Sequence, residues 1–169
     1  LMLADLDSLE LEHSHCYGRK TFHVNANWKL VMEPFLEAYH VRRLHSTTVG
    51  PMFEDVSGIF DVIDGYHTRQ ISGRGDFTPD MLDIPDENVH KIATMTWQLL
   101  PSTVLIGSPY YFSVMIVIPT AANKTQVDYH MVTRTPPDNE KAKELYARSY
   151  DMILDVFGNE DFRASQISQ

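Results

Sequence analysis

The stretch TMTWQLLPSTVLIGSPYYFSVMIVIPTAANKTQVDYHMVT, residues 94–133, decides the fold that the sequence predicts. It contains four strand-like runs separated by short turns, at residues 94–100, 103–108, 110–118 and 126–133. Strands joined by turns this short pair antiparallel, because parallel pairing needs a long crossover connection. The stretch therefore predicts an antiparallel sheet.

Further strands are expected on the N-terminal side of this stretch. Alternating residues predict a strand over 17–26, and short strands are predicted near residues 58–63 and 66–72. Residues 73–88 are polar, with several glycines and prolines, and are expected to form a long surface loop.

Two helical patterns complete the order of elements. The first runs from Trp28 to about Val41, and the second runs over residues 139–157. Gly158 interrupts the second pattern, and a short further helix is expected from Asn159. Because one face of the sheet needs covering, the long C-terminal helix is the expected cover. We therefore predict an α+β fold in which an antiparallel sheet wraps around a long C-terminal helix.

Composition excludes several classes of protein. A length of 169 residues predicts one domain, and a net charge of -9 argues against a nucleic-acid binder. No apolar run approaches the roughly 20 residues of a membrane-spanning helix, so no membrane segment is expected. Cys16 is the single cysteine, which excludes an intrachain disulfide or a cysteine-ligated iron–sulfur cluster within these residues and favours a cytoplasmic location.

Both ends of the chain look cut. Leu1 is not a start methionine, and residues 161–169 still read as helix without a capping glycine or proline. We therefore expect a piece of a longer polypeptide, with the acidic residues 1–13 as a lead-in segment.

His40 and His45 are candidate metal ligands at the end of the first helical pattern. Residues five apart on a regular helix differ by about 140° in direction, so both can bind one metal only if the helix ends or distorts after His40. Glu37 lies three residues before His40 on the same helical face, where its carboxylate can accept an imidazole N–H. Two such histidines alone are a weak signal, since solvent-facing or capping histidines give the same pattern.

The surrounding residues carry a resemblance to a known family. Asn27-Trp28-Lys29, followed by Glu37-x-Tyr39-His40 and His45, resembles the iron-binding helix of Rieske non-haem iron oxygenase α subunits, the aromatic-ring-hydroxylating dioxygenases and their monooxygenase and demethylase relatives. Glu160-Asp161 with Gln169 resembles the family's last ligand helix, and residues 97–102 resemble a strand end of the family. Pro34 departs from the family's usual asparagine, which removes a polar contact and favours a kink.

The resemblance implies that residues 1–169 form a mononuclear-iron catalytic domain with His40, His45 and Asp161 on Fe(II). It implies a substrate pocket at Pro34, Phe35, Val41 and Phe157, and an electron-transfer role for Glu37 between neighbouring α subunits of a homotrimer or an α3β3 assembly. Electrons would come from NAD(P)H through a reductase or ferredoxin. They would pass through a Rieske [2Fe-2S] cluster in an N-terminal domain absent from this sequence. The implied reaction is hydroxylation of a small organic, often aromatic, substrate with dioxygen.

Three alternatives stay open from the sequence. The same helix-grip, START/Bet v 1-like architecture serves small-molecule carriers without redox chemistry. Two imidazoles and a carboxylate also suit the zinc of a hydrolase. Glu160 competes with Asp161 as the acidic ligand. Among the other candidates, Trp28 and Trp97 are expected in the core, and His90 is expected to face solvent.

Overall fold

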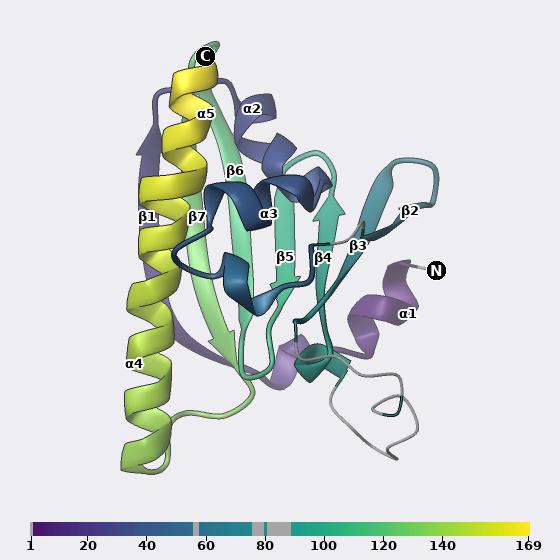
Figure 1. The fold of residues 1–169 in the computed structure, drawn as a ribbon, viewed down its shortest axis with the longest axis vertical. Helices are drawn as coiled ribbons and strands as arrows, with labels where there is room; N and C mark the ends of the chain where they lie inside the picture. The colour runs from purple at the N-terminus through teal and green to yellow at the C-terminus, as the bar shows by residue number, and fades with distance from the viewer. Residues whose placement is uncertain (1, 56–57, 76–79, 81–88) are drawn as a thin grey trace.

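The computed structural model describes residues 2–55, 58–75, 80 and 89–169. Its centre is a seven-stranded antiparallel sheet in the order β1-β7-β6-β5-β4-β3-β2 (Figure 1). The strands are β1 His15–Val24, β2 Ile59–Ile63, β3 His67–Gly73, β4 Ala93–Leu99, β5 Thr103–Gly107, β6 Phe112–Ala121 and β7 Lys124–Thr133. The predicted α+β fold is confirmed. Most of the surface loop expected over residues 73–88 lies outside the described residues.

The four strands predicted from residues 94–133 pair in series, as their short turns require. β4 pairs with β5, β5 with β6, and β6 with β7, each antiparallel. β1 closes the other side of β7, with His15 opposite Thr133 and Val24 opposite Thr125. This pairing joins segments more than a hundred residues apart, so burial rather than a local turn sets its register.

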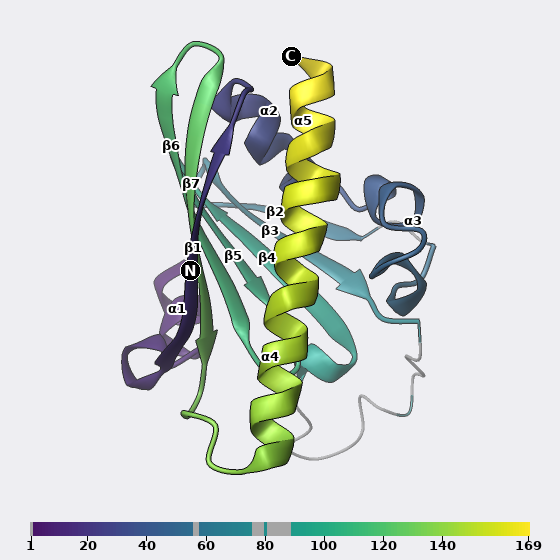
Figure 2. The same cartoon turned by 90° about the vertical axis from the view of Figure 1, so that its left-hand side faces the viewer.

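One long helix covers one face of the sheet. It consists of α4 (Glu140–Asp155), a π-helical turn (Val156–Asp161) and α5 (Phe162–Ser168), which follow one another without a break (Figure 2). The predicted interruption at Gly158 is therefore wrong. Gly158 is instead a place of close packing, where an added Cβ would lie 3.2 Å from the Phe22 ring. The chain absorbs one extra residue in the π turn and continues as helix.

The single helix predicted from Trp28 to about Val41 is also wrong. α2 (Trp28–Met32) passes into a 3₁₀ turn (Glu33–Leu36), Glu37 is extended, and α3 (Tyr39–Leu44) starts a new helix. Pro34 lies in the 3₁₀ turn, where its missing N–H ends regular helix formation, so the predicted kink is confirmed. The buried Gln98 of β4 donates from Nε2 to the Met32 carbonyl at 2.7 Å, which satisfies a group at the end of α2. The break thus precedes His40 and does not follow it.

The residues 1–13 expected as a lead-in contain α1 (Met2–Asp7), which lies on the sheet face opposite the long helix (Figure 2). Met2 and Leu9 pack there with Trp97, Leu105 and Phe112 in a second hydrophobic core. Trp97 is 2% exposed, which confirms its predicted core position. Trp28 is half-buried against the main core beneath the long helix.

His90 is buried and does not face solvent as expected. Its ring makes edge contacts with Trp97 and Phe112. Gly107 leaves the space for the imidazole, because an added Cβ at this position would collide with the ring. Over the described residues, no helix is long and apolar enough to cross a membrane.

Candidate metal centre

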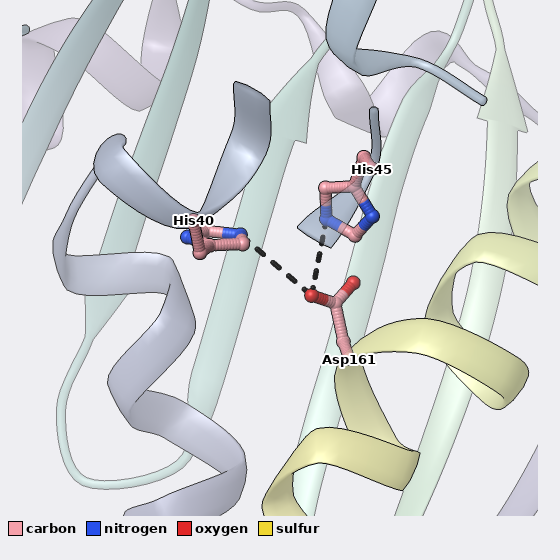
Figure 3. Close-up of side chains that lie close together, drawn as sticks. All are labelled: His40, His45 and Asp161. Atoms are coloured by element: carbon pink, nitrogen blue, oxygen red, sulfur yellow. Dashed lines mark ion pairs between the residues drawn. The ribbon is translucent and has the colours of Figure 1, made fainter. Parts of the chain in front are cut away.

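His40, His45 and Asp161 converge at one point between α3 and the long helix (Figure 3). The Asp161 Oδ1 atom lies 3.2 Å from His45 Nε2 and 3.6 Å from His40 Nε2. The two imidazole rings are 5.2 Å apart at an angle of 75°. All three candidate ligand atoms lie within 4.8 Å of one another, so a single ion could contact all three after small side-chain movements.

Backbone irregularities aim these three side chains. His40 lies in the first turn of α3, and His45 ends that helix with φ -93° and ψ 26° outside the helical region. A continuous helix would point two side chains five residues apart in directions about 140° different. The non-helical backbone of His45 lets the two imidazoles face a common point instead. Asp161 is the last residue of the π turn. π turns occur often at functional sites, and here the turn carries the aspartate toward the histidines.

Carboxylates hold the outer nitrogen of each histidine. Glu37 Oε1 lies 2.6 Å from His40 Nδ1, and Glu160 Oε2 lies 2.6 Å from His45 Nδ1. Thr48 Oγ1 donates a second hydrogen bond to Glu160 at 2.8 Å. A proton on each Nδ1 leaves the Nε2 lone pairs toward Asp161, which is the orientation that metal-binding histidines adopt when a carboxylate holds their other nitrogen.

Glu160 and Asp161 take different positions, which bears on which of the two acids could bind the metal. Glu160 contacts the outer nitrogen of His45, whereas Asp161 lies on the inner side between the two rings. Glu37 contacts His40 as expected, but for another reason. It precedes α3 in extended conformation, and its Oε2 also accepts the backbone N–H of His40 at 3.1 Å.

The electrostatics of the centre favour a bound cation. The Asp161 residue is 2% exposed, and its Oδ1 atom has no hydrogen-bond partner among the described residues. A buried carboxylate oxygen without a partner is costly unless a cation or donor meets it. Burial alone would lower the pKa of His45, but the negative charge of Asp161, together with the hydrogen bond and charge of Glu160, outweighs burial and raises it. Two imidazoles and one carboxylate therefore fit a divalent transition metal such as Fe(II) or Zn²⁺.

The centre opens onto a cavity of about 460 Å³ between the sheet and the long helix. This volume lies within the range of small-molecule pockets, about 300–1,000 Å³. The four residues expected at a substrate pocket, Pro34, Phe35, Val41 and Phe157, all line the cavity beside the three candidate ligands.

Sequence reasoning missed the sheet side of this cavity. Gln70, Ser72, Thr94 and Thr96 line it from β3 and β4. The signal was present in the alternation of β4, because Thr94, Thr96 and Gln98 share one face of a strand whose other face carries Met95 and Trp97. Thr48, which bonds Glu160, follows no motif, and only the tertiary structure reveals it.

The structure thus combines a helix-grip fold with two histidines and one aspartate that face a cavity. A family model described as the ring hydroxylating alpha subunit (catalytic domain) matches residues 11–169. The chain therefore belongs to this family, as its resemblance indicated. A search of curated proteins gave no match.

Solved structures show the same fold. The quaternary ammonium Rieske monooxygenase CntA, in complex with inhibitor MMV12, has a TM-score of 0.71 at 16% identity over 94% of this chain and 39% of that chain. Naphthalene 1,2-dioxygenase from Rhodococcus sp. bound to indole has a TM-score of 0.67 at 15% identity over 95% and 46%. Dicamba monooxygenase bound to 3,6-dichlorosalicylic acid has a TM-score of 0.54 at 13% identity over 92% and 49%. The chain thus spans less than half the length of these proteins.

Proposed function

We propose that this chain is the catalytic domain of a Rieske-type non-haem iron oxygenase and binds Fe(II) through His40, His45 and Asp161. The observation that carries the proposal is the buried Asp161 Oδ1, which faces both Nε2 atoms without a hydrogen-bond partner of its own among the described residues. Iron(II) in this position would supply dioxygen activation for hydroxylation of an organic substrate, aromatic in our proposal, that fits the cavity of about 460 Å³.

The chain's own residues orient the reactants and exclude water. Glu37 and Glu160 fix the two imidazoles from their outer nitrogens, so the Nε2 atoms need only small movements to bind the ion. Phe35 and Phe157, whose ring centroids are 6.0 Å apart, form an apolar wall of the cavity near the centre. An aromatic substrate packed against this wall would lie beside the metal centre and displace water from it.

Glu37 is proposed to deliver electrons. Its side chain is 39% exposed and contacts His40, so it links the surface to the metal centre. It also lines a second, outer depression of about 170 Å³ together with Leu36, Tyr39 and Phe60. These three apolar side chains are exposed, and they offer a docking surface for a cluster domain.

The rest of the proposal follows the family. The Rieske [2Fe-2S] cluster would be held by an N-terminal domain of the same polypeptide and would dock at Glu37 of a neighbouring α subunit, in a homotrimer or an α3β3 assembly. NAD(P)H would supply the electrons through a reductase or ferredoxin. Dioxygen and a small organic substrate, aromatic in our proposal, would react in the cytoplasm.

The alternative function is a helix-grip module that binds a small molecule without redox chemistry. The cavity of about 460 Å³ favours it, because a carrier needs such a space whether or not a metal is bound. A carrier does not need two histidines and an aspartate at the cavity wall. Metal content therefore separates the two functions.

The test is metal analysis of protein purified without oxygen. We expect about one iron per chain in the wild type and loss of iron in His40→Ala and Asp161→Asn, with circular dichroism unchanged. His23→Ala is the matched control, because His23 is an exposed histidine of β1 outside the cavity lining. Wild-type protein that takes up no metal would favour the carrier. Zinc in place of iron would favour a hydrolase.

A further inference from the structure

Gln70 brings a hydrogen-bond acceptor without a partner to the cavity wall. It lines the cavity from β3 and is 7% exposed, yet its Oε1 atom has no hydrogen-bond partner among the described residues. Its Nε2 donates to Ser72 Oγ at 3.2 Å, which occupies the amide nitrogen and leaves the amide oxygen to another group. A buried carbonyl oxygen without a donor is costly, so this position calls for a donor from a molecule in the cavity.

One other atom of the cavity lining has the same property. Among the described residues that line the cavity, Asp161 Oδ1 is the second buried side-chain atom without a hydrogen-bond partner. The cation proposed at the metal centre would satisfy this carboxylate. An amide oxygen is not a ligand that an imidazole-rich iron site favours, so Gln70 needs a donor of a different kind.

Other polar groups on this face of the sheet have partners within the protein. Ser113, which also lines the cavity, lies 3.2 Å from the Tyr129 hydroxyl. Gln98 is a second buried glutamine on the same face, and its Nε2 donates to the Met32 carbonyl at 2.7 Å. Gln98 supports the fold and does not line the cavity. The free amide oxygen of Gln70 is therefore not a general feature of this face.

Gln70 lies toward the metal centre. It lines both the main cavity and the outer depression of about 170 Å³, and Glu37 lines both as well. Glu37 in turn contacts His40 Nδ1 at 2.6 Å. A group bound to Gln70 would thus occupy the Glu37 side of the cavity, near the candidate ligands.

The helix side of the cavity is apolar, and Met152, Ile153 and Val156 line it. We propose that the substrate is an apolar molecule with one hydrogen-bond donor, a hydroxyl or an N–H, and that Gln70 Oε1 accepts this bond and so sets which part of the substrate faces the metal centre. The inference rests on the proposed function, since it takes this cavity as the substrate site. A molecule whose only polar atom is an acceptor would leave Gln70 Oε1 without a partner and is a poorer ligand.

The test compares indole with benzofuran by calorimetric titration of the full-length protein as purified. The two molecules share one fused-ring shape and differ at a single position, an N–H donor in indole and an oxygen acceptor in benzofuran. We expect the wild type to bind indole at least about tenfold more tightly, because only indole satisfies the buried oxygen. A cavity without an acceptor would not prefer indole, since burial of an unpaired N–H is costly.

Gln70→Met should remove the preference for indole, because methionine has nearly the length of glutamine and no amide oxygen. Gln126→Met is the matched control, since Gln126 lies on β7 and does not line the cavity. Equal affinities in the wild type, or tighter binding of benzofuran, would overturn the inference, and this comparison stands even if Gln70→Met does not fold. A preference that persists in folded Gln70→Met would overturn it too, because the N–H would then be bound elsewhere.

Iron measured in the same samples separates this inference from the proposed function. Iron without a preference for indole contradicts only the role of Gln70. A preference that is lost in Gln70→Met, in protein that takes up no iron, supports the donor site and contradicts only the oxygenase.

Discussion

Replacing Glu160 by Gln should weaken metal binding without removing a ligand. Glu160 Oε2 lies 2.6 Å from His45 Nδ1 and accepts a second bond from Thr48 at 2.8 Å. His45 is 3% exposed, so water replaces little of this contact. A charged acceptor contributes about 1.5–3 kcal/mol against about 0.5–1.5 kcal/mol for a neutral one. The difference of about 1–1.5 kcal/mol corresponds to a roughly tenfold loss of affinity, within the about 10–100-fold range of such partners.

The assay is competition for Fe(II) against a chelator of known affinity, under anaerobic conditions. It should be run well above the ordinary histidine pKa of about 6.5, so that proton competition at His45 is small. Glu144→Gln is the matched control, because Glu144 is exposed on α4. An affinity equal to that of the wild type would refute the argument that Glu160 orients His45. Complete loss of the metal would show that Glu160 binds it directly.

Three further predictions concern electrons and protons. Glu37→Gln in the full-length enzyme should keep its iron while turnover falls at least about tenfold, or about 1.4 kcal/mol. Unchanged turnover with an intact oligomer would make Glu37 a structural acid, and loss of iron would make it part of the metal shell. The 169 residues alone should show no NADH-driven turnover, even with iron and a reductase. The reason is that they hold one cysteine, whereas a Rieske centre takes two. Repeated turnover would contradict the proposal that electrons come from a Rieske cluster in another domain. Fe(II) affinity should rise with pH through and above about 6.5, because the raised pKa of His45 keeps a proton on the ligand that the metal must displace. An affinity independent of pH in this window would contradict the ligand role of His45.

The same raised pKa affects the metal-free protein in the opposite direction. A histidine whose pKa is higher in the folded state contributes stability that is complete below its unfolded pKa and is lost as the pH rises through its folded pKa. For His45 this window begins at about 6.5 and extends upward. Acid therefore favours the metal-free centre, whereas neutral and alkaline conditions favour the metal-bound one.

The strands and the C-terminal helix could be predicted because their signals are local. Residues 94–133 carry their own turns, and the observed strands β4 to β7 lie within a few residues of the predicted ones. Asn139 caps α4, where its Oδ1 accepts the Ala142 N–H at 2.9 Å. The burial of His90 and the packing of α1 could not be predicted this way, because both depend on residues of β4 to β6 that are distant in sequence.

The candidate site was predictable as a set of residues but not as a geometry. The sequence motifs identified His40, His45 and Asp161 as candidate ligands. A regular helix, however, would place the two histidines on different faces. In the structure the helix breaks at Glu37, before both histidines, and α3 ends at His45, whose non-helical backbone lets its ring face the same point as the His40 ring. Helical propensity gave no sign of that break beyond Pro34, because the Gln98 contact that supports it comes from another element.

The two helix predictions that failed, a continuous helix over residues 28–41 and an interruption at Gly158, concern the two segments that carry the candidate ligands. α2 and α3 are separated by a 3₁₀ turn and an extended residue next to His40, and the long helix widens into a π turn that ends at Asp161. Regular helices would have been more stable locally, since each irregular turn weakens the helical hydrogen bonds around it. Main-core packing of Phe35, Phe157 and Phe162 holds both irregular segments against the sheet. Core packing therefore offsets the cost of the two irregular turns, which point three side chains toward one position. Binding of the metal proposed there would add stability to the folded chain.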